Sequence, residues 1–228
     1  MRWLIDNFPQ VAELTRTHLY LALLPLLIGL VVAVPMGTAV RRVRWLRRTT
    51  VVAASVAFTI PSLALFVTVP SVFGLSILDP NNVVIALSVY STALLIRAVP
   101  EALDAVPDDV VDAATAIGFT PLRRALTVEL PLALPVLIAN VRVVAVTNIS
   151  LVSVGALIGV GGLGELFTKG YQRDYPDQIV AGIIAIVTLA LIFDAALYLL
   201  GRRLTPWERG PRPTRTRRET LELSEGPA

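Results

Sequence analysis

Five long runs of apolar residues alternate with short polar segments along the 228-residue chain. The runs cover about 19–40, 49–69, 83–99, 132–154 and 179–200. A helix that crosses the hydrocarbon core of a bilayer needs roughly 20 mostly apolar residues, and about 22 helical residues span about 33 Å. The pattern therefore predicts an all-α integral membrane protein with five transmembrane helices.

Four prolines lie in or near these runs, and they do not change that prediction. Membrane helices tolerate proline where neighbouring groups satisfy the carbonyls that it leaves without a donor. We therefore expect each run, including the one at 49–69, to form one span. The prolines are Pro25, Pro35, Pro61 and Pro135.

The distribution of basic residues predicts the orientation of the spans, because Lys and Arg resist translocation and stay on the cytoplasmic side. If the N-terminus faces outward, the inside segments hold 15 basic residues and the outside segments hold 4. This asymmetry predicts an N-out, C-in topology. The inside segments are then 41–48, 97–131 and 201–228, and the outside segments are 1–18, 70–82 and 155–178.

Three regions follow from this topology. Residues 1–18 carry aromatic and aliphatic side chains among polar ones, which predicts a short segment at the membrane interface. Residues 19–200 form the transmembrane domain. Residues 201–228 are rich in Arg, Pro, Thr and Glu, and this composition predicts a disordered cytoplasmic tail.

The segment 100–131 between the third and fourth runs is long for a connecting loop. Pro107 suits the first turn of one short helix, and Gly118 suits its C-terminal cap. Thr120 and Pro121 suit the start of a second helix, and Pro131 marks the return to the membrane. We therefore expect an ordered helical segment exposed to the cytoplasm.

This loop carries a spaced motif. It consists of Asp112-Ala113-Ala114, then Gly118 after three residues, then Val128 after nine, then Leu130-Pro131 after one. The motif resembles the EAA motif of ABC importer permeases, with Asp in place of Glu and Val in place of Ile. The resemblance implies a coupling helix that docks on a separate ATPase subunit. It assigns this role to Asp112, Ala113, Ala114, Gly118, Leu130 and Pro131.

Four further stretches resemble the permeases for osmoprotectants such as glycine betaine, carnitine, choline or proline betaine. The stretches are 59–66, 128–135, 159–164 and 203–207. The resemblance implies an osmoprotectant importer in the bacterial plasma membrane, with two ATPase subunits, a second permease chain and an extracytoplasmic substrate-binding protein as partners. Methionine-type or other small-solute permeases remain an alternative, because they share the five-span plan and the glycine-rich segment.

A small set of polar residues interrupts the fourth and fifth runs. Charged residues inside a membrane are costly and are functional candidates by default. We expect Arg142 and Asp194 to form an ion pair between two helices, since a long arginine side chain can reach a neighbouring span. Translocation path and interhelical hydrogen bonds remain alternatives for the whole set, which is Asn140, Arg142, Asn148, Ser153 and Asp194.

The composition limits which metal, catalytic and nucleotide-binding sites the chain can form. Apolar residues make up 55% and charged residues 16%, and the mean hydropathy is +0.71. The chain has no cysteine and one histidine, so we expect no metal site and no catalytic centre. It lacks the Gly-x-x-x-x-Gly-Lys-Ser/Thr phosphate loop. We therefore expect no cofactor in this chain, with ATP and Mg²⁺ bound by the partner ATPase.

A nucleic-acid-binding protein and an ATPase-independent transporter or channel are two alternatives to this interpretation. Basic clusters also occur in nucleic-acid-binding proteins, but here long apolar runs flank them, so we expect no nucleic-acid partner. An ATPase-independent secondary transporter or channel remains an alternative. A protein of that class is expected to have ion-coupling carboxylates in several spans and an internal repeat. The spans of this chain offer Asp194 alone, and no repeat is evident.

Overall fold

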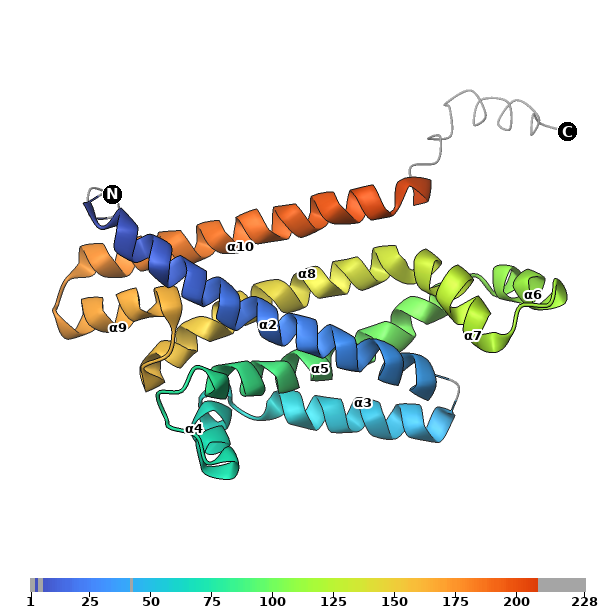
Figure 1. Ribbon diagram of the computed structural model, residues 1–228, viewed down its shortest axis with the longest axis horizontal. Helices are drawn as coiled ribbons and strands as arrows, with labels where there is room; N and C mark the ends of the chain where they lie inside the picture. Colours follow the sequence, from blue (N-terminus) through green and yellow to red (C-terminus); the bar gives the residue numbers. More distant parts are fainter. Residues whose placement is uncertain (1–2, 4–5, 42, 209–228) are drawn as a thin grey trace, which may run out of the picture.

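The computed structural model describes residues 3, 6–41 and 43–208, and within these residues it is helical, without strands (Figure 1). Long helices run side by side along the molecule, with short helices at its two ends. The elements are α2 (Phe8–Val40), α3 (Arg44–Thr59), α4 (Ser62–Phe73), α5 (Asn81–Asp104), α6 (Asp108–Ala116), α7 (Pro121–Arg124), the π-helical turn η1 (Ala125–Glu129), α8 (Leu130–Gly155), η2 (Ala156–Ile158), η3 (Gly162–Gly164), α9 (Glu165–Gln172), α10 (Pro176–Leu204) and η4 (Pro206–Glu208).

Four helical stretches of the described chain are long and apolar enough to cross a membrane. They contain the predicted first, third, fourth and fifth runs, so the all-helical class and these four spans are confirmed by length and composition. Each helix extends beyond its apolar run into polar sequence. The stretches are Phe8–Val40, Asn81–Asp104, Pro121–Ile158 and Pro176–Leu204.

The prediction of one continuous helix at 49–69 is wrong. The run divides into α3 and α4, which meet at an angle of 98°. The break lies at Pro61, which has no N–H to donate, and the preceding Ile60 is extended with φ −66° and ψ 129°. The hydroxyl of Tyr90 donates a hydrogen bond to the Ile60 carbonyl oxygen, so an acceptor left without a helical partner is satisfied from α5.

Both ends of the transmembrane domain differ from the predicted boundaries. Helix α2 is continuous through the boundary that we placed between residues 18 and 19. Helix α10 continues to Leu204, and η4 follows at Pro206–Glu208. Residues 201–208 are therefore helical rather than part of a disordered tail, and the rest of that predicted tail, 209–228, lies outside the described residues.

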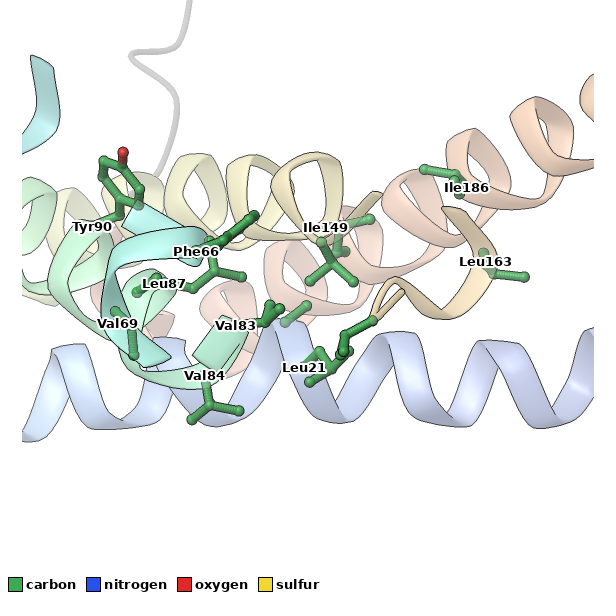
Figure 2. Packing of buried hydrophobic residues seen from close by; sticks show 14 of the residues in the cluster. Leu21, Phe66, Val69, Val83, Val84, Leu87, Tyr90, Ile149, Leu163 and Ile186 are labelled. Atoms are coloured by element: carbon green, nitrogen blue, oxygen red, sulfur yellow. The ribbon is translucent and has the colours of Figure 1, made fainter. Parts of the chain in front are cut away.

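The helices pack through buried apolar side chains and through small residues. Figure 2 shows one cluster, in which Leu21, Phe66, Leu87 and Ile149 gather between α2, α4, α5 and α8, and all four are fully buried. Elsewhere α2 approaches α5 so closely that a Cβ atom on Gly29 would lie 2.6 Å from the Cβ atom of Ser91. Membrane helices commonly associate through such small residues.

Candidate functional sites

The coupling segment, which we define as α6, α7 and η1, lies at one end of the molecule, away from α9 (Figure 1). Thr120 occupies the N-cap position of α7 as predicted, although its side chain makes no capping hydrogen bond. Pro107 was predicted in the first turn of α6 and lies one position earlier, at the N-cap. Gly118 has a φ of +89°, and the adjacent Phe119 N–H donates to the carbonyl of Ala114. A left-handed glycine therefore turns the chain between the two helices.

The residues of the spaced motif occupy different environments. Asp112, Ala113 and Gly118 are exposed on the coupling segment, whereas Ala114 is only 6% exposed. Leu130 packs against the core cluster around α2, α5 and α8. Pro131 lies in the first turn of α8, and the helical stretch that begins at Pro121 is continuous through it.

Large apolar side chains accompany the exposed motif residues. Ile117 is 76% exposed and Leu122 is 71% exposed, and both belong to the short stretch around the turn at Gly118. Single exposed apolar residues need no explanation, but two large ones within five positions of a structured turn make it a candidate protein-binding surface. The coupling segment thus presents small, apolar and acidic side chains together.

A buried glutamate anchors the coupling segment to the helix bundle. Glu129 is 2% exposed, and its two oxygens accept hydrogen bonds from different arginines. Nε of Arg124 donates to Oε1 at 2.8 Å, and Nη1 of Arg41 donates to Oε2. Arg41 also donates to Oδ1 of Asp104 at 2.7 Å and to the Leu103 carbonyl at 2.9 Å. One carboxylate therefore joins η1 and α7 to the end of α2 and, through it, to α5.

The same network reaches two more helices. Nη1 of Arg124 donates to Oγ1 of Thr115 on α6 at 2.5 Å, and Nη1 of Arg47 on α3 lies 2.8 Å from Oδ2 of Asp104. We did not predict a role for Glu129, because it occupied a variable position of the spaced motif. Its presence in an otherwise apolar stretch beside an arginine-rich segment was the available signal.

The intramembrane charges form the predicted ion pair. Nε of Arg142 on α8 donates to Oδ1 of Asp194 on α10 at 2.8 Å, and Nη2 donates to Oδ2 at 2.6 Å. The two parallel hydrogen bonds make this a bidentate pair, the stronger geometry for guanidinium and carboxylate. The side chains remain 30% and 33% exposed, so the pair lies on an open face of the chain.

The other predicted polar residues do not gather around this pair. Asn148 is fully buried, and its amide donates to the Ala22 carbonyl at 3.0 Å and to Oγ of Ser91 at 2.8 Å. It therefore joins α8 to α2 and α5. Asn140 donates to the carbonyl one turn earlier on α8. The hydroxyl of Ser153 is buried and, among the described residues, has no hydrogen-bond partner.

Comparison with solved structures supports the same architecture. The inward-facing MetNI methionine ABC transporter contains a chain that matches with a TM-score of 0.75 and 24% identity, covering 84% of this chain and 94% of that one. A structure of an amino acid ABC transporter with histidines matches with a TM-score of 0.66 and 20% identity, covering 87% and 96%. The fold is that of an ABC importer permease.

Sequence comparison identifies the family. The model for the binding-protein-dependent transport system inner membrane component matches residues 26–206. The osmoprotectant import permease protein OsmW of Salmonella typhimurium is 34% identical over 90% of this chain and 97% of its own length. The glycine betaine/carnitine/choline transport system permease protein OpuCB of Bacillus subtilis is 29% identical over 90% and 94%. The chain therefore belongs to the family of binding-protein-dependent transport system inner membrane components, the permease subunits of ABC importers.

Proposed function

We propose that this chain is the permease of an ATP-driven importer for small osmoprotectants such as glycine betaine, carnitine, choline or proline betaine. The observation that carries the proposal is the likeness to an osmoprotectant import permease over nine-tenths of the chain. Family membership supports an ABC importer over the secondary transporter or channel that the sequence left open. The methionine transporter shares the fold, but its lower identity carries no argument about substrate.

We further propose that the chain crosses the bacterial plasma membrane five times, with its N-terminus outside and its C-terminus inside. The bent pair of α3 and α4 is then the second span, broken at Pro61. The excess of basic residues on 41–48, 97–131 and 201–228 supports this orientation. The coupling segment and the Glu129 network then lie at the cytoplasmic face.

In this proposal ATP is bound and hydrolysed, with Mg²⁺, by a separate ATPase, and the coupling segment is its docking site. Asp112, Ala113 and Gly118 meet the ATPase directly, since they are exposed on α6 and the turn after it. Ala114 is buried, and its small side chain allows α6 to pack closely against the residues beneath it. Leu130 and Pro131 hold the start of α8 against the bundle.

Movement of the docked ATPase then reaches the spans through the buried carboxylate of Glu129. The ion pairs of this residue join the coupling segment to α2, and Arg41 continues the link to α5. Interfaces of this kind transmit displacement because a packed, hydrogen-bonded contact resists gradual deformation. A complete importer has two such permease chains, two ATPase subunits and an extracytoplasmic substrate-binding protein that delivers the solute.

Uptake by the reconstituted importer tests the proposal. The chain is expressed with its genomic neighbours in a bacterial strain that lacks osmoprotectant importers, and uptake of labelled glycine betaine, carnitine, choline and methionine is measured. We expect uptake of at least one osmoprotectant, and we expect its loss when the ATPase partner cannot hydrolyse ATP. Uptake of methionine without any osmoprotectant would overturn the substrate class, and uptake independent of the ATPase would overturn the mechanism.

A further inference from the structure

The ion pair of Arg142 and Asp194 is more exposed than the buried network at Glu129. The two side chains are 30% and 33% exposed, whereas the Glu129 side chain is 3% exposed. The pair borders a cavity of about 390 Å³, whose other lining residues are Ala139, Val143, Val146 and Thr147. Small-molecule pockets have volumes of about 300–1,000 Å³, so the cavity can admit a small solute beside the two charges.

The pair also lies deep in the proposed membrane region. Asp194 lies six residues before the apolar run ends at Leu200, a rise of about 9 Å. Arg142 lies ten residues after the apolar run begins at Leu132, a rise of about 15 Å. Partly exposed charges at this depth are too costly to face lipid, so their open side faces water or protein.

An aromatic ring flanks the pair outside the cavity. The guanidinium carbon of Arg142 lies 5.1 Å from the ring centre of Tyr198, and that of Arg202 lies 5.9 Å from the same centre. The ring therefore supports the guanidinium of Arg142 through a cation–π contact. The cavity itself is bordered by one guanidinium and one carboxylate, among small, apolar and hydroxyl side chains.

We propose that Arg142 and Asp194 form a transient subsite for a zwitterion that carries a carboxylate and a quaternary ammonium group. The subsite rests on the proposed function. The carboxylate of the solute accepts the two parallel hydrogen bonds of Arg142. The ammonium group pairs with the carboxylate of Asp194 in the cavity.

The exchange of partners keeps every charge compensated. Without solute, Arg142 and Asp194 neutralise each other through two hydrogen bonds. With solute, each of them pairs with the opposite charge of the zwitterion, so one internal pair is replaced by two intermolecular pairs. Leaving one member of a buried pair without its partner is the costly event, and this exchange avoids it. The pair therefore opens at a lower cost for a molecule with both charges than for a cation alone.

Comparison of two substrates tests the subsite in the importer reconstituted with its ATPase and binding protein. Glycine betaine carries both charges, whereas choline has the quaternary ammonium group and no carboxylate. We expect Arg142→Gln to lower the uptake rate of glycine betaine about tenfold or more and that of choline about threefold or less, because one charged hydrogen-bond partner is lost for glycine betaine alone. Asp194→Asn should lower both rates, since both substrates present the cation.

Lys169→Gln is the matched control. It also removes the cation of a partly exposed ion pair, the one with Glu165 on α9, and it should leave both rates near those of the wild type. If Arg142→Gln lowers both substrates equally, the pair is a structural link and the proposal is wrong. Should that variant fail to assemble, Arg142→Lys, which keeps the charge but not the bidentate geometry, is judged by the same ratio.

A double variant separates folding from solute binding. Arg142→Leu with Asp194→Leu removes both charges, so no unpaired charge remains to prevent assembly. We expect this variant to co-purify with the ATPase and to lose glycine betaine uptake. Uptake at the wild-type rate would overturn the subsite. If instead the wild-type importer carries none of the osmoprotectants, the proposed function fails, and that outcome is distinct from a failure of the subsite.

Discussion

Replacing Glu129 with glutamine keeps the shape of the side chain and removes its charge. In the wild type, the carboxylate accepts hydrogen bonds from Arg124 and Arg41 in a buried position. The amide oxygen of glutamine can accept from one guanidinium, but its NH₂ group then meets the other guanidinium donor to donor. The substitution therefore leaves one arginine of the network without its acceptor.

The expected loss of stability follows from the remaining contacts. Removing one partner of a buried ion pair costs about 3–5 kcal/mol. Arg41 keeps Asp104 and the Leu103 carbonyl, and Arg124 keeps Thr115, so we expect the lower end, about 3 kcal/mol. For a chain of this size each kcal/mol shifts Tm by about 2–4 °C, which gives a decrease of roughly 6–12 °C.

Thermal unfolding of the purified permease in detergent measures this effect, with Arg47→Gln as the control. Arg47 belongs to the same network, but its pair with Asp104 is exposed, with 37% and 39% of the side chains accessible. An exposed pair contributes about 0–1 kcal/mol, so the control should melt close to the wild type. The ATPase should also co-purify less well with Glu129→Gln, since the coupling segment loses its anchor. Equal melting temperatures and equal ATPase recovery for the two variants would refute the anchoring role of Glu129.

Three more predictions test other parts of the structure. Gly118→Val should leave the protein in the membrane and abolish ATP-driven uptake, because a φ of +89° strains an L-residue by about 1–2 kcal/mol. Gly74→Val is the control, since Gly74 has a φ of +67° and equally open space; if it abolishes uptake as well, Gly118 has no specific role in coupling. Since the chain has no cysteine, Arg44→Cys should resist a membrane-impermeant thiol reagent in intact cells and Asp79→Cys should react, and the reverse pattern would contradict the N-out topology. Asn148→Leu should lower Tm by breaking two buried hydrogen bonds worth about 1–3 kcal/mol together, and an unchanged Tm would show that the amide is dispensable.

The apolar runs predicted four spans well, because long helices of uniform hydropathy leave few alternatives. They did not predict the break at Pro61. Pro25, Pro35 and Pro135 lie inside helices, so the presence of proline alone does not decide between a continuous and a broken span. At Pro61 the hydroxyl of Tyr90, thirty positions away, satisfies the Ile60 carbonyl. Such a distant partner has no local signature.

In the functional sites, too, features set by nearby residues were predictable and most features set by distant partners were not. Gly118 and Thr120 were predictable because turn and capping signals act over a few residues. The pair of Arg142 and Asp194 was predictable because two isolated charges in apolar sequence have few other partners. For Asn148 the sequence left interhelical hydrogen bonds open as one of two roles, but it did not indicate the partners, since one acceptor is a backbone carbonyl on α2 and backbone groups carry no sequence signal.

The continuity of the helix from Pro121 to Ile158 has a mechanical consequence. Its 38 residues make a rod of about 57 Å, which begins in the coupling segment and ends beyond α8. Such a rod acts as a lever, so a tilt of only about 5° at α7 displaces the far end by about 5 Å, close to one helical pitch. Because Pro131 and Pro135 lie inside the rod without breaking it, little of that displacement is absorbed along the way. In the proposed topology, a small rotation of the coupling segment at the cytoplasmic face thereby moves the end of this helix at the outer face.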